Sequence, residues 1–161
     1  MTESSEAGQN PLTQRLRAWD PEAIVELREF RGELTAVASQ EHLRRVAAYL
    51  RTETGLEFDF LSDISAVDRF PMEPRFELNY HLLSLVKRQC LNLLVRVRGG
   101  VHPVVDTVTT VWPTADWHER EIFDLFGVRF EGHPDLRRIL MPDDWDGYPL
   151  RKDYPVEGFR S

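Results

Sequence analysis

The sequence predicts a single α/β (α+β) domain, with one mixed or antiparallel sheet covered by helices and an extended C-terminal tail. Three observations support this prediction. Apolar and polar residues alternate along several short runs, as they do in strands. Other segments repeat apolar residues every three or four positions, as amphipathic helices do. Four of the ten prolines fall after residue 130, where they interrupt any helix or sheet ladder.

Composition narrows the class of protein. A chain of 161 residues fits one domain. The formal net charge of −7 argues against nucleic acid as a partner, since that partner requires clustered Lys and Arg. The single cysteine, Cys90, can form no internal disulfide and cannot by itself ligate an iron–sulfur cluster. We expect a reducing compartment, with Cys90 as a small buried strand residue.

Neither a membrane span nor a signal peptide is expected. The uncharged run Leu78–Val86 is nine residues long, whereas about 20 are needed to cross a bilayer. Residues 1–10 carry two acids and no apolar stretch, which predicts a disordered N-terminus that is not a signal peptide. The chain is therefore expected to stay in the cytoplasm and to meet a membrane only through partners.

The predicted body covers residues 11–130. Its first half alternates helices with strands, and Gly32 supplies a tight turn because Gly tolerates positive φ. Ser39 is the expected N-cap of the second helix, which Gly55 ends. In order, we expect a helix over 11–19, strands over 24–30 and 33–38, a helix over 40–53, and a strand from 56 towards 67.

The second half of the body is predicted to contain a hairpin and the most informative helix. Alternation over 76–86 and 91–97, around a polar segment, predicts antiparallel strands. Asp106 is expected to cap a short helical turn that reaches Trp112. A longer helix follows over 115–126, capped by Thr114 or Asp116, and Gly127 occupies its C-terminal position.

This helix carries Glu119, Arg120, Glu121 and Asp124 among four large apolar residues. The ordinary interpretation is a solvated face on which Arg120 and Asp124, four residues apart, form a surface pair. His118 and Glu121, three apart, resemble half of a metal site, but a closed site needs more ligands. Acid–base catalysis by His118, Glu119 and Glu121 would need a shaped pocket.

Other chemical signatures are weak or absent. The sequence has no Gly-rich phosphate loop, no nucleophile elbow and no flavin or nicotinamide fingerprint. Asp143-Asp144-Trp145-Asp146 lacks the spacing of a calcium loop, so a polar turn is the expected structure.

The tail, residues 131–161, combines prolines with many large apolar residues. A disordered segment would contain fewer of them, so these residues need a surface on which to pack. We expect an extended segment that buries Trp145, Tyr148 and Tyr154 against a neighbouring subunit. The basic tail residues are expected to pair with acids of the partner or with Glu119, Glu121 and Asp124. These basic residues are Arg137, Arg138, Arg151 and Lys152.

The order of residues in Glu119–Gly127 and His133–Leu140, continuing through Met141–Pro155, resembles the signature of one family. This family is the 30 kDa subunit of proton-pumping NADH:quinone oxidoreductase, respiratory complex I. The resemblance is specific over about residues 115–155 and only general upstream. The matching residues taken as interface residues are Glu119, Arg120, Glu121, Asp124, Gly127, His133, Arg137, Arg138, Pro142, Trp145, Tyr148, Arg151, Lys152 and Tyr154.

The resemblance implies a non-catalytic scaffold subunit in the quinone-reducing part of the hydrophilic arm, packed on the 49 kDa subunit. It implies that FMN and iron–sulfur clusters belong to partner subunits and that this chain holds no cofactor or metal. It also implies a peripheral location on the cytoplasmic side of the inner membrane. Alternatives are the equivalent subunit of an F420H2 dehydrogenase, a photosynthetic NDH complex or a membrane-bound hydrogenase, a stand-alone acid–base enzyme, or a small adaptor of unrelated partners.

Overall fold

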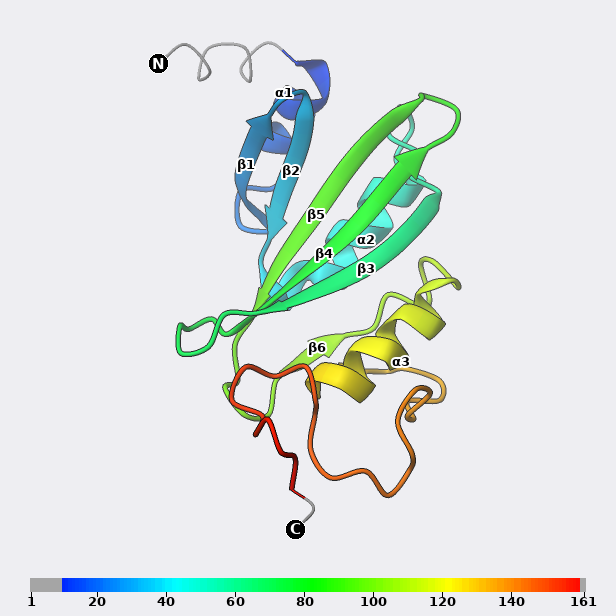
Figure 1. Ribbon diagram of the computed structural model, residues 1–161. Coiled ribbons are helices and arrows are strands. Elements are labelled where there is room, and N and C mark those ends of the chain that lie inside the picture. Colours follow the sequence, from blue (N-terminus) through cyan, green and yellow to red (C-terminus); the bar gives the residue numbers. More distant parts are fainter. Residues whose placement is uncertain (1–9, 160–161) are drawn as a thin grey trace.

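The computed structural model describes residues 10–159. The predicted disordered N-terminus lies outside the described residues except for Asn10, which is the N-cap of the first helix. The predicted mixed sheet with helices is confirmed (Figure 1). The helices are α1 (Pro11–Trp19), α2 (Leu43–Thr52) and α3 (Ala115–Phe126), and the strands are β1 (Ile24–Phe30), β2 (Glu33–Ala38), β3 (Phe60–Asp68), β4 (Phe76–Ser84), β5 (Gln89–Val97), β6 (Val104–Asp106) and β7 (Arg129–Glu131).

The main sheet has five strands in the order β1-β2-β5-β4-β3. The β2–β5 pair is parallel, and the other pairs are antiparallel. The predicted hairpin of β4 and β5 is confirmed. The turn between β1 and β2 contains Arg31 and Gly32, both with positive φ (52° and 81°). Two consecutive residues with positive φ give the turn a backbone twist that matches the right-handed twist of the flanking strands, which explains this short connection.

One hydrophobic core joins the sheet to the helices. In Figure 1 α2 lies behind β3, β4 and β5. The buried stripe of α2 belongs to the same core cluster as the alternate buried residues of β4 and β5, from Phe76 to Leu82 and from Leu91 to Val97. Trp19 stacks on Tyr49 with ring centroids 3.8 Å apart, which ties α1 to α2. Trp112 donates from Nε1 to the carbonyl of Phe58 and fixes the segment that leads into α3.

Some boundaries differ from the prediction. The segment 40–42 is a 3-10 turn, so α2 proper begins at Leu43. The third strand begins at Phe60, not at residue 56. Asp106 ends β6 and caps no helix. Cys90 is exposed, which corrects its predicted burial. β2 pairs with β5 only from Asn92 onward, so the start of β5 lacks a neighbour on that side.

A second, two-stranded sheet leads into the tail. β6 and β7 pair in parallel. Residues 132–159 then contain no helix or strand, and Figure 1 shows them looping round the end of α3 in orange and red. Within the described part of the chain, no helix is long and apolar enough to cross a membrane.

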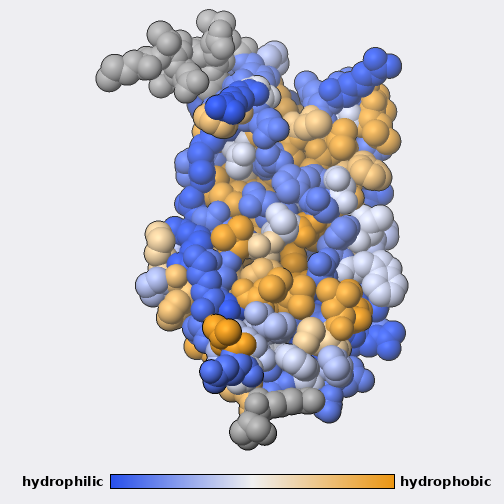
Figure 2. Space-filling model, viewed as in Figure 1, coloured by the Kyte–Doolittle hydropathy of each residue, from blue (hydrophilic) through white to orange (hydrophobic). Residues whose placement is uncertain are grey.

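The surface is mostly polar. Figure 2 shows hydrophilic residues over most of the visible face, with hydrophobic side chains gathered in its middle and towards the upper right. Leu85 and Val86, in the turn between β4 and β5, are among the exposed hydrophobic residues. Leu140 and Leu150 of the tail are others.

Candidate functional site

The candidate site comprises α3 and the tail residues that lie against it. Gly127 ends the helix in the left-handed conformation, with φ 77°, and its N–H bonds to the carbonyl of Phe123. A Cβ at Gly127 would lie 2.6 Å from the Tyr148 ring and 2.5 Å from Nη2 of Arg151. Glycine is therefore required here twice, by the backbone and by the close packing of the tail.

The predicted solvated face of α3 is wrong. Glu119 and Asp124 have no exposed surface, and Arg120 is 6% exposed. Glu121 alone among the four charged signature residues is exposed. Buried charges require partners because their desolvation is costly. Arg120 pairs with Asp116 four residues earlier on α3. The other partners come from the tail and from the segment before α3, which helical spacing alone could not reveal.

Asp124 is the first anchor of the tail. Its Oδ1 accepts from Nη1 of Arg138 at 2.8 Å. Its Oδ2 accepts from three consecutive backbone N–H groups, those of Ile139 (3.1 Å), Leu140 (2.7 Å) and Met141 (2.9 Å). Burial alone would raise the pKa of Asp124, but these donors outweigh it and hold the pKa below its usual value. The carboxylate therefore fixes both the path and the direction of the tail.

Arg138 connects this anchor to a later part of the tail. It also donates to the carbonyls of Gly147 (2.9 Å) and Trp145 (3.3 Å). Its guanidinium lies over the Tyr148 ring, with 5.2 Å to the centroid. The predicted pairing of Arg138 with a signature acid is thus found within the chain itself.

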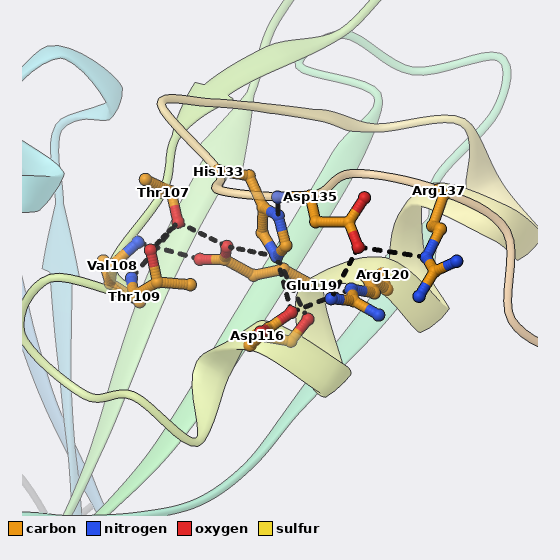
Figure 3. Close-up of polar contacts among 9 residues, drawn as sticks. All are labelled: Thr107, Val108, Thr109, Asp116, Glu119, Arg120, His133, Asp135 and Arg137. Atoms are coloured by element: carbon orange, nitrogen blue, oxygen red, sulfur yellow. Dashed lines mark hydrogen bonds and ion pairs between the residues drawn. The ribbon is translucent and has the colours of Figure 1, made fainter.

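Glu119 has a different environment (Figure 3). Thr107 donates from Oγ1 to Oε2 at 2.5 Å, and the N–H of Val108 donates to Oε1 at 2.8 Å. Within residues 10–159, the basic side chain at ion-pair distance from it is His133, whose Nε2 lies 3.9 Å from Oε2. Burial, together with the neighbouring Asp116 charge, outweighs the two donors and raises the pKa of Glu119 to about 7.

His133 and Arg120 form the second anchor, which joins the start of the tail to the first turns of α3. Nε2 of His133 lies 3.2 Å from Oδ1 of Asp116. Nδ1 of His133 accepts from the N–H of Asp135 at 3.0 Å. Arg120 lies 2.8 Å from Asp116 and 3.3 Å from Asp135. The predicted Arg120–Asp124 pair is therefore wrong, because Arg120 pairs with Asp116 and Asp135 whereas Asp124 pairs with Arg138.

The end of the tail is held by a third anchor that the sequence patterns did not predict. Asp68 and Arg75, both buried, form a bidentate pair with distances of 2.8 and 2.9 Å. Arg75 also donates to Asp153 at 2.7 Å, and the N–H of Lys152 donates to Asp68 at 2.8 Å. The sequence around Arg75 could not indicate its contact with the tail, because the tail partner, Asp153, lies 78 positions away.

Arg151 reinforces this anchor. It donates from Nε to the carbonyl of Phe126 at 2.6 Å and from Nη2 to that of Val101 at 3.0 Å. Its guanidinium lies over the rings of Phe76 and Tyr148.

The remaining tail residues named from sequence do not form one cluster. Trp145, Tyr148 and Tyr154 are half-buried, Pro142 and Lys152 are exposed, and the exposed Arg137 pairs with Asp135.

Glu119 and Glu121, two of the residues named for acid–base catalysis, lie in different environments. Glu119 is sealed from solvent whereas Glu121 is exposed, so the two do not face a common opening. No group of three or more His, Cys, Asp or Glu side chains within residues 10–159 is placed to hold a metal ion. The arrangement around α3 holds chain segments together through buried charges.

Comparison with known proteins gives a consistent result. Residues 36–160 match the family model described as the 30 kDa subunit of respiratory-chain NADH dehydrogenase. The chain is 48% identical over 145 residues to an NADH-quinone oxidoreductase subunit of Roseiflexus sp. (strain RS-1), covering 90% of this chain and 83% of that one. It is 42% identical to the corresponding subunit of Geotalea uraniireducens (strain Rf4), covering 94% and 91%.

A solved structure resembles the fold as well. It is a chain in the structure of the membrane-bound sulfane sulfur reductase, described as an archaeal respiratory membrane complex. The TM-score is 0.75 and the identity is 26%, with 90% of this chain and 84% of that chain covered.

Proposed function

Because the chain belongs to the family of the 30 kDa subunit of respiratory-chain NADH dehydrogenase, we propose that it is a non-catalytic scaffold subunit of NADH-quinone oxidoreductase. In this proposal it packs on the 49 kDa subunit in the quinone-reducing part of the hydrophilic arm. It is peripheral on the cytoplasmic side of the inner membrane and is held there by partner subunits.

The observation that carries the proposal is how the charged signature residues are used. Asp124 is saturated by Arg138 and three backbone donors. Arg120 bridges two aspartates, and Glu119 has no exposed surface. Charged groups whose hydrogen-bonding capacity is used within the chain, or that have no exposed surface, hold the fold together and are not available to a substrate. The signature thus supports assembly more directly than catalysis.

The tail supplies a surface for the partner. Its anchors face the body, whereas Leu140 and Leu150 are 61% and 52% exposed. Val156 and Phe159 are exposed too. Exposed apolar side chains on a segment that its own body holds in place are typical of a preorganised contact surface, because little ordering entropy remains to be lost on binding.

We propose that the chain itself holds no cofactor and that FMN and iron–sulfur clusters belong to partner subunits. Its one cysteine cannot ligate a cluster alone. The purified chain is expected to lack visible absorbance and stoichiometric iron. Detection of either in freshly purified protein would contradict this part of the proposal.

The scaffold role is tested by changing the outward face of the tail and leaving its anchors intact. Leu140→Asp combined with Leu150→Asp should prevent co-purification with the 49 kDa subunit and reduce membrane-bound quinone reduction. Leu85→Asp is the matched control, because Leu85 is equally exposed (62%) in the turn between β4 and β5. Normal assembly of the double variant would refute the docking surface.

A related complex is the second candidate. The structural similarity to a chain of the sulfane sulfur reductase complex favours use of this fold in more than one membrane complex. The equivalent subunit of an F420H2 dehydrogenase, a photosynthetic NDH complex or a membrane-bound hydrogenase would share the same tail contacts. Identification of the proteins that co-purify with the chain distinguishes these complexes, since each has its own electron-input subunits.

A further inference from the structure

Glu119 differs from two other buried carboxylates of the chain, Asp68 and Asp124. Each of those faces an arginine as well as backbone N–H donors. Glu119 receives one backbone N–H and one hydroxyl, and Nε2 of His133 is 3.9 Å away. Its negative charge is therefore poorly compensated inside the core, where uncompensated charge is costly.

The hydroxyl beside Glu119 is arranged to serve two protonation states. Oγ1 of Thr107 lies 2.5 Å from Oε2 of Glu119 and 2.9 Å from Oγ1 of Thr109, and it accepts from the N–H of Thr109 at 3.1 Å. A hydroxyl has one proton to donate and two lone pairs. With Glu119 charged, Thr107 donates to the carboxylate and accepts twice from Thr109. With Glu119 protonated, Thr107 accepts from the acid and donates to the Thr109 hydroxyl.

The hydroxyl pair ends at the protein surface. Thr109 is half-buried and lines an open surface cavity of about 320 Å³. Thr110, Asp116, Gly132 and Pro134 line the same cavity. Thr107 is buried. The two hydroxyls therefore connect the sealed carboxyl of Glu119 to a residue that lines this open cavity.

We propose that Glu119 is a buried proton-exchange site, connected to solvent through the hydroxyls of Thr107 and Thr109, and that its charge controls how the start of the tail is held through His133. A proton that enters at the cavity passes to Thr109, which releases its own proton to Thr107, and Thr107 releases its own to Glu119. Each hydroxyl gains one proton and loses one, so the only net change is protonation of the carboxyl.

The surroundings of Glu119 are consistent with this role. Burial raises the pKa of Glu119 to about 7, so both states are populated near neutral pH. The charged or titratable groups that face it are Tyr80 from β4, Asp116 from α3 and His133 from the tail. The Tyr80 hydroxyl is buried and makes no hydrogen bond within the described part of the chain. Burial first, and the Glu119 charge second, raise the Tyr80 pKa well above its usual value.

His133 is the group through which a change in charge reaches the tail. Its side chain is fully buried, and Nδ1 accepts from Asp135, which places a ring proton on Nε2. Nε2 lies 3.2 Å from the backbone carbonyl oxygen of Asp116, 3.2 Å from its Oδ1 and 3.9 Å from Oε2 of Glu119. Protonation of Glu119 removes the attraction of its carboxylate and leaves the two Asp116 oxygens as the partners of Nε2. The position of residues 133–135 should respond accordingly. This inference does not depend on the complex in which the chain works.

The test is an NMR titration of the full chain that follows the side-chain carboxyl carbons of Glu and the ring nitrogens of His133. In the unchanged protein, Glu119 should titrate near pH 7, and the His133 signals should shift with the same midpoint. Thr107→Val removes the donor to the charged form, so both midpoints should rise, by about one pH unit for one charge-assisted hydrogen bond.

Thr109→Val distinguishes the relay from simple burial. Without the Thr109 hydroxyl, Thr107 has no acceptor for its proton when Glu119 is protonated, so both midpoints should fall. Thr107→Ser keeps the hydroxyl and should restore the original midpoint. Thr110→Val is the matched control, because this exposed residue lines the same cavity without bonding to the relay.

The titration midpoints of the variants decide between the proposal and its failure. Opposite shifts in Thr107→Val and Thr109→Val, with His133 following Glu119 in each, support the proposal. Three results would overturn it. The first is that Glu119 titrates with the midpoint of an ordinary glutamate, and the second is that the midpoint does not fall in Thr109→Val. The third is that the His133 signals do not shift at the midpoint of Glu119. All the Thr variants retain Glu119, so the test does not depend on whether a Glu119 substitution folds.

Discussion

Asp124 on α3 and Arg138 in the tail lie 2.8 Å apart, and this ion pair joins two segments that are 14 residues apart in the chain. Asp124 is fully buried and Arg138 nearly so. The tail therefore does not depend on a neighbouring subunit for its whole course. It is folded against its own body at His133, at Asp124 and at the Asp68–Arg75 pair.

Replacement of Asp124 by Asn should loosen the tail more than any other single change on α3. The amide cannot match a carboxylate that accepts from Arg138 and three N–H groups, and Arg138 would keep a buried, unpaired charge. The expected loss is on the order of 2 kcal/mol or more of unfolding free energy. Urea unfolding measures it, and hydrogen exchange at residues 139–141 locates it. The exposed Arg137→Ala is the control, and an equal loss there would argue against the anchor.

Gly127→Ala should displace Tyr148 and Arg151. The backbone at φ 77° costs a non-Gly residue about 1 kcal/mol, and the new methyl group would collide with both side chains. We expect a lower Tm together with changed Tyr148 ring resonances. Gly32→Ala is a useful comparison, because Gly32 also has positive φ (81°) but nothing lies near its missing Cβ. If both variants lose the same stability, the packing contribution at Gly127 is absent.

Stability should fall between about pH 5 and pH 8 because of Glu119. Its folded pKa is about 7 against 4.5 unperturbed, so the native state binds more protons than the unfolded state across this window. A shift of that size corresponds to about 3 kcal/mol lost as pH rises through it. Glu119→Gln should flatten this slope in urea titrations at several pH values. A slope that persists unchanged in the variant would assign the effect to another group.

The Asp68 anchor should behave in the opposite way. Burial alone would raise its pKa, but Arg75 and the N–H groups of Lys152 and Phe70 lower it to about 2. A depressed carboxyl pKa adds stability above its unfolded value, and this is lost as pH falls through the folded value. The anchor should therefore hold at pH 5 and open only in strong acid.

Release of this anchor can be detected by trypsin, which cleaves after Arg151 and Lys152. Asp68→Asn should speed cleavage there because it removes the acceptor of the Lys152 N–H and the partner of Arg75. Asp153→Asn should have a smaller effect, since Asp153 is exposed. Asp143→Asn, elsewhere on the exposed tail, is the control. Equal cleavage rates in all three variants would contradict an anchor at Asp68.

Removal of the tail would affect the body as well as the contact with a partner, because the anchors join the two. A chain that stops after Phe130 would leave Asp124, Asp68 and Arg75 without their tail partners, so loss of assembly could reflect a weakened body. The surface changes at Leu140 and Leu150 separate the two effects, because both side chains are exposed and neither takes part in a side-chain anchor.

Local patterns in the sequence were enough to predict most of the secondary structure and the family, but not β6 and β7. Periodicity predicted α1, β1, β2 and the β4–β5 hairpin because neighbouring side chains set these elements. The signature over 119–155 is similarly local, and it identified the family. Spacing could not show that Glu119 and Asp124 are buried, because the cost of a charged residue depends on what covers it. Folding alone brought Thr107, His133 and Arg138 to those carboxylates and placed Arg75 between Asp68 and Asp153. Partners so far apart in sequence meet only in three dimensions, and the environment they create decides the charge state of each acid.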